Sequence, residues 1–227
     1  MTAGVFVTGT DTGVGKTLVG TALVRRLAGT GRRVAAMKPV ASGCERTRAG
    51  LRNADALALA AASNLAADYD CINPYAFEPA IAPHLAAREA GVVIDPARIL
   101  AAFRALSERA DAVVVEGVGG WQVPIGDDAT MADVARLLDL PVVLVVGIRL
   151  GCINHALLTA QAVRAAGLSL AGWVACRVDP ACERPEENVA AIGERLAAPL
   201  LGDIPWLASA SPDAAAACLE DVLPLLS

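Results

Sequence analysis

Short runs of apolar residues, rich in branched side chains, recur along the chain without alternating with polar residues. The clearest runs cover residues 4–7, 112–115, 142–146 and 170–175, and weaker ones cover residues 33–37 and 200–204. Uninterrupted runs of this length are typical of strands that are buried on both faces of a parallel sheet. The pattern therefore predicts a mostly parallel sheet with both faces covered.

Segments with helical spacing of apolar residues lie between these runs. One covers residues 16–28 and stops at Gly29, and another covers residues 96–109, with Asp95 as N-cap and Pro96 in the first turn. Further helices are expected after a capping box of Thr130 and Asp133, and at residues 154–166, 185–196, 58–62 and 214–217. Alternating strands and helices predict a doubly wound α/β fold. Because no repeat or low-complexity linker divides the chain, residues 1–227 are expected to form one domain.

The charge composition narrows the possible partners. The 227 residues include 19 basic and 24 acidic side chains, and the formal net charge is −5. Because the basic residues are scattered singly or in pairs, no basic stripe is available to bind a run of phosphates, and nucleic acid is not an expected partner. Lysine is rare, since seventeen of the basic residues are arginines and only Lys16 and Lys38 are lysines.

The cysteines and histidines do not indicate a metal or redox centre. The six cysteines never form a Cys-x-x-Cys pair, and His84 and His155 are far apart in the sequence. We expect free thiols in a reducing cytosol and structural histidines. The longest apolar run, residues 141–148, is too short to span a membrane. The chain is therefore expected to be cytoplasmic and to bind no membrane.

A glycine-rich loop is the strongest functional signal. Residues 9–17, Gly-Thr-Asp-Thr-Gly-Val-Gly-Lys-Thr, lie directly between the first predicted strand and the first predicted helix, as a phosphate-binding loop requires. Its backbone N–H groups would surround the phosphates, Lys16 would reach the β- and γ-phosphates, and the Thr17 hydroxyl would bind Mg²⁺. The usual pattern is G-x-x-x-x-G-K-[ST]. Here Thr10 takes the first glycine position, and the glycine comes one residue earlier.

Three further positions are candidates for the same site. Glu116 ends a predicted strand, where a carboxylate beside a phosphate loop can hold a metal ion. Lys38 follows another predicted strand. Because the chain uses arginine at nearly all other basic positions, a lysine here indicates a need for a compact ammonium, which can contact a phosphoryl group where a broad guanidinium would not fit. Asp55, in a helix that Asn53 can cap, either complements the helix dipole or contacts the metal, and both remain open. Nearby arginines are expected in a solvated loop: Arg46, Arg48 and Arg52.

Five strings together resemble dethiobiotin synthetases, in the same order and over nearly the whole chain: residues 9–17, 38–43, 115–121, 150–155 and 202–207. The resemblance implies a P-loop NTPase-like fold and a reaction that depends on Mg²⁺ and ATP. In that reaction 7,8-diaminononanoate (7,8-diaminopelargonate) takes up CO₂ to form a carbamate, which attacks the γ-phosphate. The second amine then closes the carbamic-phosphoric anhydride to dethiobiotin, with release of ADP and phosphate.

The resemblance also implies roles for individual residues. Lys38 and Lys16 would be catalytic, and the metal ligands would be Thr17, Asp55 and Glu116. Ser42 would bind the substrate amine or carbamate. The nucleotide-binding set would be Thr12, Gly13, Val14, Gly15, Lys16, Thr17, Leu18, Asp55, Glu116, Gly117, Val118, Gly119, Cys176, Arg177, Pro205, Trp206 and Leu207. The substrate carboxylate would be received across a homodimer interface by Gly151, Cys152, Ile153 and Asn154, at a helix N-terminus.

Two positions depart from the family pattern. Cys176 stands where family members often have an Asn that reads adenine, and a Glu often found after the Pro-Trp-Leu string is replaced by Pro212 or a neighbour. Without that amide, base discrimination is expected to be looser, or to rest on backbone groups near Arg177 and residues 205–207.

Two other classes of protein share the phosphate loop. A partitioning-type regulatory ATPase carries a signature lysine five residues before the loop lysine, where this chain has Asp11. A small-molecule kinase shares the loop and the metal-binding acid but usually needs an arginine-rich lid. A requirement for CO₂ separates the synthetase from the kinase.

Overall fold

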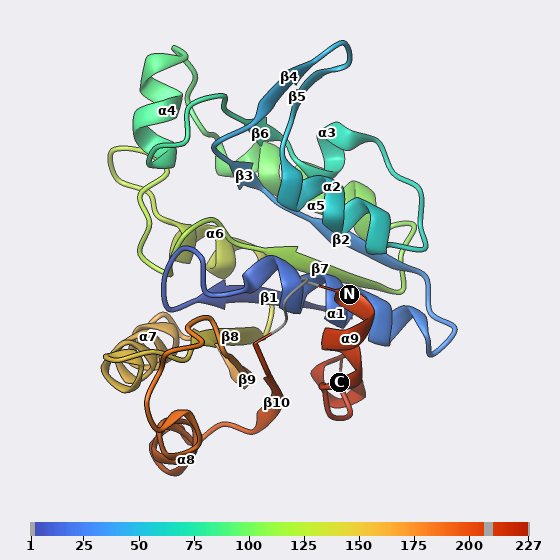
Figure 1. Ribbon diagram of the computed structural model, residues 1–227. Helices are drawn as coiled ribbons and strands as arrows, with labels where there is room; N and C mark the ends of the chain where they lie inside the picture. Colours follow the sequence, from blue (N-terminus) through green and yellow to red (C-terminus); the bar gives the residue numbers. More distant parts are fainter. Residues whose placement is uncertain (1–2, 207–210, 227) are drawn as a thin grey trace.

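A computed structural model describes residues 3–206 and 211–226 of the chain, and a six-stranded sheet lies at its centre (Figure 1). The strand order is β10-β9-β8-β1-β7-β2, and every neighbouring pair is parallel. The strands are β1 (Ala3–Gly9), β2 (Val34–Met37), β7 (Ala112–Glu116), β8 (Val142–Gly147), β9 (Leu170–Cys176) and β10 (Leu200–Ile204). All six predicted strands are therefore present.

Helices cover both faces of this sheet. One face packs against α1 (Lys16–Ala28), α2 (Ala54–Ala62) and α9 (Pro212–Ala217). The other packs against α5 (Pro96–Ser107), α6 (Met131–Leu138), α7 (Cys152–Ala165) and α8 (Pro185–Leu196). Along β1, Val5 and Val7 point to the first face and Phe6 to the second, and all three are fully buried. Burial on both faces explains why the strands do not alternate polar and apolar residues, and it confirms the doubly wound α/β prediction.

Several helices begin where the capping residues in the sequence predict. Asp95 caps α5, Thr130 and Asp133 form the capping box of α6, and the Asn53 side chain accepts a hydrogen bond at the start of α2. Helix α7 starts two residues before its predicted start, because Gly151 takes a left-handed conformation (φ 91°) that leads directly into the first turn.

The region between β2 and α5 contains several short elements that periodicity does not predict. Strand β3 (Val40–Ala41) pairs with β6 (Tyr75–Ala76), and β4 (Glu45–Thr47) forms a hairpin with β5 (Gly50–Arg52). Short helices follow at α3 (Tyr69–Ile72) and α4 (Pro83–Glu89), and a 3₁₀ turn, η1, covers Leu223–Leu226. The expected solvated loop of arginines is therefore an exposed β-hairpin, in which Arg46 pairs with Glu78 at 2.6 Å.

The topology gathers the predicted functional residues at one edge of the sheet. Strands β2 and β1 both pair with β7, with Met37 opposite Val115 and Val7 opposite Glu116. Because the strands are parallel, their carboxyl ends lie side by side, and the loops that follow them start from the same place.

Across residues 3–206 and 211–226, the helices are all too short or too polar to cross a membrane.

Candidate active site

A cavity of about 810 Å³ opens at the carboxyl ends of β1, β2 and β7. Twelve of the predicted site residues line it: Thr12, Gly13, Gly15, Lys16, Thr17, Leu18, Lys38, Ser42, Asp55, Glu116, Val118 and Gly119. They come from positions more than 100 residues apart in the sequence. The site is therefore assembled by the order of the strands.

The glycine-rich loop owes its shape to two glycines. Gly13 (φ 73°) and Gly15 (φ 94°) are in the left-handed region, which side chains disfavour. A Cβ atom on Gly15 would lie only 2.4 Å from the Cys176 sulfur, at the end of β9. The Lys16 ammonium donates a hydrogen bond to the Asp11 carbonyl at 2.6 Å. Burial, followed by the nearby charge of Lys38, lowers the pKa of Lys16 to about 8.

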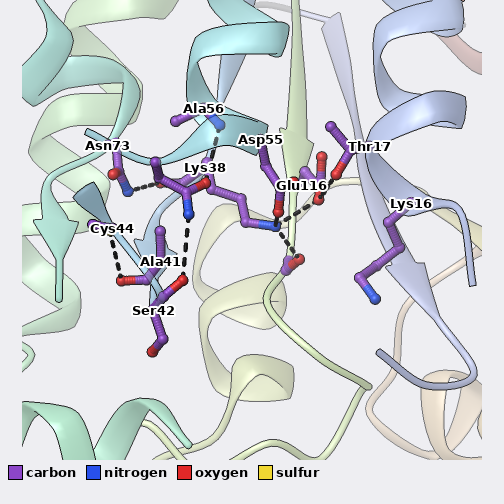
Figure 2. Close-up of polar contacts among 12 residues, drawn as sticks. Lys16, Thr17, Lys38, Ala41, Ser42, Cys44, Asp55, Ala56, Asn73 and Glu116 are labelled. Carbon is purple, nitrogen blue, oxygen red and sulfur yellow. Dashed lines mark hydrogen bonds and ion pairs between the residues drawn. The ribbon is translucent and has the colours of Figure 1, made fainter. Parts of the chain in front are cut away.

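The Lys38 ammonium lies among oxygen atoms from three segments (Figure 2). It contacts Glu116 Oε1 at 2.5 Å, Asp55 Oδ2 at 3.0 Å and the Gly117 carbonyl at 3.4 Å. Burial acts against the charge of Lys38, but the two carboxylates outweigh it and raise its pKa. Burial likewise acts against the charge of Asp55, and the Lys38 charge outweighs it and lowers the pKa of that carboxyl. Asp55 lies in the first turn of α2 and also lines the cavity, so its position is compatible with both alternatives, the helix dipole and a metal contact.

The donor set beside Lys38 suits a hard divalent cation. Thr17 Oγ1 donates to Glu116 Oε1 at 2.9 Å, so a hydroxyl and two carboxylates meet at one point. Glu116 is fully buried, and its Oε2 has no hydrogen-bond partner among the described residues. Oxygen ligands of this kind, with an unsatisfied carboxylate oxygen, are what Mg²⁺ binds in nucleotide sites. Described residues contain no group of three His, Cys, Asp or Glu side chains that could hold a metal by themselves.

Ser42 lies across the cavity from the glycine-rich loop, after β3. Its hydroxyl oxygen is buried and has no hydrogen-bond partner in the described part of the chain. Its backbone carbonyl accepts a hydrogen bond from Asn53 Nδ2 at 3.3 Å, which fixes the segment. A fixed, unpaired hydroxyl on the cavity wall is available to bind a ligand.

The remaining predicted residues do not line the cavity. Gly151 is the N-cap of α7, and Cys152, Ile153 and Asn154 form its first turn. Just before the helix, Arg149 forms an ion pair with Asp11 of the glycine-rich loop at 2.5 Å. Neither His84 nor His155 lines the cavity either.

Among the described positions predicted near the base, Cys176 lies against the loop, and none of Cys176, Arg177, Pro205 and Trp206 lines the cavity. Arg177 is held by Asp203 (2.8 Å) and Glu186 (2.7 Å), so its guanidinium already has partners. Burial, followed by the charge of Asp203, raises the pKa of the Cys176 thiol to about 11. The other positions of the nucleotide-binding set lie as follows: Val14 is a buried residue of the loop itself, Gly117 follows β7, Pro205 and Trp206 follow β10, and Leu207 is outside the described residues.

Sequence reasoning missed one wall of the cavity. Residues 80–83, at the start of α4, face the glycine-rich loop, and Val123 and Pro124 close one end. The only local signal is the pair Pro79 and Pro83, which brackets a short segment but carries no functional pattern. Asn53 also lines the cavity, although the sequence suggested it only as a helix cap.

Comparisons with known proteins bear on the whole chain. A family model described as an AAA domain matches residues 3–214. A protein from Pseudomonas paraeruginosa named ATP-dependent dethiobiotin synthetase BioD is 59% identical over 216 residues, which are 95% of each chain. A protein of the same name from Xanthomonas oryzae pv. oryzae is 54% identical over 220 residues, or 97% of this chain and 96% of that protein.

Solved structures of similar fold are more distant in sequence. The septum site-determining protein MinD from Pyrococcus horikoshii, complexed with Mg-ADP, has 17% identity and a TM-score of 0.52, and the match covers 96% of this chain and 87% of that one. A ParA family ATPase from Chlorobium tepidum has 15% identity and a TM-score of 0.54, with 91% and 84% covered. These likenesses concern the P-loop NTPase-like fold alone.

Proposed function

Since the chain belongs to the family of ATP-dependent dethiobiotin synthetases, we propose that its cavity closes the ureido ring of dethiobiotin from 7,8-diaminononanoate, CO₂ and ATP. One observation carries the assignment of this chemistry to the cavity. Both lysines of the chain, the buried Glu116 and the unpaired Ser42 hydroxyl line the same space. The named synthetases are 59% and 54% identical to this chain over nearly its whole length, which favours a synthetase over a partitioning ATPase or a small-molecule kinase.

The proposed chemistry makes demands that these residues can meet. One substrate amine adds to CO₂ with loss of a proton, and a carbamate oxygen then attacks the γ-phosphorus as ADP leaves. The second amine attacks the carbamate carbon, phosphate leaves with the C–O bond electrons, and the attacking nitrogen loses a proton to give the ureido ring. Because anionic groups must approach one another, cationic charge in a buried site lowers the barrier, and Lys16 and Lys38 supply it. The Ser42 hydroxyl would orient the amine or carbamate.

We assign the remaining roles as the family resemblance implies. Thr17, Asp55 and Glu116 would hold Mg²⁺, which neutralises phosphate charge when bound, and the unsatisfied Glu116 oxygen supports this assignment. The glycine-rich loop would bind the phosphates through its N–H groups.

We further propose a cytoplasmic homodimer in which residues 151–154 of one copy receive the substrate carboxylate bound to the other. The exposed apolar side chains near the start of α7, Leu150 and Leu158, support a protein contact on this face. The described residues are organised around one central sheet, which supports a single domain, and the six free cysteines suit a reducing compartment.

A single assay tests the function directly. The protein is incubated with MgATP, bicarbonate and 7,8-diaminononanoate, and the products are identified by mass spectrometry. We expect dethiobiotin and ADP in equal amounts, and ADP formation that requires both the diamine and CO₂. Accumulation of ADP without dethiobiotin would indicate an ATPase instead, and a phosphorylated product that forms without CO₂ would indicate a kinase.

Nucleotide selectivity gives a separate prediction. The buried Cys176 thiol is a weak hydrogen-bonding group and cannot match the base edge as an amide does. We expect kcat/KM for ATP, CTP and GTP to differ by less than about a hundredfold. We also expect Cys176→Asn to increase the preference for ATP. Steady-state kinetics with the three nucleotides measure this, and a strong ATP preference that Cys176→Asn leaves unchanged would contradict the prediction.

A further inference from the structure

Behind the cavity, three polar side chains form a chain of hydrogen bonds that the chemistry above does not use. They are Asn53, Tyr69 and Asn73, from the start of α2 and from both ends of α3. Asn53 and Asn73 are only 6% and 3% exposed. Tyr69 and Asn73 do not line the cavity, so substrates bound there would not meet them.

Asn53 connects two walls of the cavity. Its Oδ1 accepts a hydrogen bond from the Ala56 N–H at 3.2 Å, which caps the helix that carries Asp55. Its Nδ2 donates to the Ser42 carbonyl at 3.3 Å. A single amide group therefore determines how Ser42 lies relative to Asp55.

Tyr69, in α3, links Asn53 to Asn73 through its hydroxyl group. Its hydroxyl oxygen accepts a hydrogen bond from the Asn53 N–H at 2.8 Å. Because that N–H can only donate, the hydroxyl proton is left for Asn73 Oδ1, at 3.2 Å. The Arg52 guanidinium lies 4.0 Å above the centre of the Tyr69 ring and holds the ring in place.

Asn73 is the last residue in this chain of hydrogen bonds, and its side chain binds the backbone of Lys38 (Figure 2). Its two Nδ2 protons go to the carbonyls of Lys38, at 2.7 Å, and Tyr75, at 3.1 Å. The Lys38 N–H donates to the Ile72 carbonyl at 2.7 Å. Because β2 ends at Met37, the central sheet does not hold Lys38, and residues 72–73 hold both of its backbone polar groups instead.

We infer that Asn53, Tyr69 and Asn73 are positioning residues that hold the backbone of Lys38 and Ser42 and the helix of Asp55 in one fixed arrangement. Their polar side-chain atoms each have a hydrogen bond to a backbone group or to one another. Displacement of a reacting group by about 1 Å can cost about a hundredfold in rate. The inference rests on the proposed function only for its kinetic consequence.

The kinetic test uses Tyr69→Phe, which removes the hydroxyl group that links Asn53 to Asn73 in the chain of hydrogen bonds. Tyr75→Phe is the matched control, since the buried Tyr75 hydroxyl accepts a hydrogen bond from the Asp95 N–H at 2.8 Å, outside the chain. We expect Tyr69→Phe to lower kcat about tenfold or more, with KM for ATP within about twofold of wild type, and Tyr75→Phe to leave kcat unchanged. Equal kcat values in the two variants at similar Tm would overturn the inference.

A second test does not depend on turnover, because the chain has only two lysines. Protein labelled with ¹³C at lysine Cε should give two side-chain NMR signals, assigned with Lys16→Arg and Lys38→Arg. We expect Tyr69→Phe to shift or broaden the Lys38 signal and to leave Lys16 as in wild type, and Tyr75→Phe to change neither. An unchanged Lys38 signal in Tyr69→Phe would overturn the inference, whether or not the protein forms dethiobiotin.

A further variant covers the case in which Tyr69→Phe does not fold. Asn53→Ser retains a good N-cap for α2 but removes the amide that donates to the Ser42 carbonyl. We expect a KM for the diamine raised about fivefold or more, because Ser42 loses its support, with Tm close to wild type. An unchanged KM would overturn the role given to Asn53.

Discussion

We expect Lys38→Arg and Lys16→Arg each to keep the fold and to lower kcat by about a hundredfold or more. At position 38 a positive charge remains to pair with the buried Glu116, so the fold is retained. The guanidinium is broader than the ammonium and is planar, and it cannot occupy the point that contacts Glu116, Asp55 and the Gly117 carbonyl together. Lys16 is also buried, and its compact ammonium donates to the Asp11 carbonyl within the glycine-rich loop, where a broad, planar guanidinium is a poor replacement.

Steady-state kinetics and circular dichroism check this prediction together. Arg32→Lys, at a half-buried position just before β2 that does not line the cavity, is the matched control and should leave kcat unchanged. If either lysine variant keeps a near-normal kcat with intact structure, the position of the two lysines in the cavity is a coincidence of composition.

The second large effect concerns stability. Glu116→Gln leaves the buried Lys38 ammonium with Asp55 as its only anionic partner in the described part of the chain, and Asp55 is partly exposed. Removal of one member of a buried pair typically costs about 3–5 kcal/mol, because the other charge stays in the interior without compensation. We expect a loss of this order in the free energy of unfolding, measured by urea denaturation at pH 7.

A double variant separates this cause from general damage. Lys38→Met combined with Glu116→Gln removes both charges, and it should regain most of the stability that Glu116→Gln loses. Glu78→Gln is the surface control, since Glu78 pairs with Arg46 where both side chains are largely exposed, and it should barely change stability. Additive losses in the double variant would contradict the buried-pair explanation.

Much of the site was predictable because its signals are local. The glycine-rich loop is recognised from nine consecutive residues, and Glu116 from an acid that ends an apolar strand. Lys38 was suggested by composition, which depends on no structure at all. Parallel strands then explain why these three positions meet, since β1, β7 and β2 are neighbours in the sheet and their carboxyl ends lie at one edge.

The rest depends on contacts between irregular segments. Strands β3 and β6 have two residues each, too few for any period to appear. The hydrogen bond from Asn73 to Lys38 spans 35 residues, and nothing in the local pattern of either position indicates it. The arginine hairpin was wrongly expected as a loop for the same reason, because three-residue strands that are exposed carry no hydrophobic pattern.

The contact between Gly15 and Cys176 constrains how this protein can diverge. The sulfur occupies the space in which a side chain on the loop glycine would begin, although the two residues lie 161 positions apart. A larger residue at position 176 must turn away from the loop or displace it. The sulfur therefore keeps position 15 free of any side chain, and a variant such as Cys176→Asn should be tested for triphosphate affinity as well as for base preference.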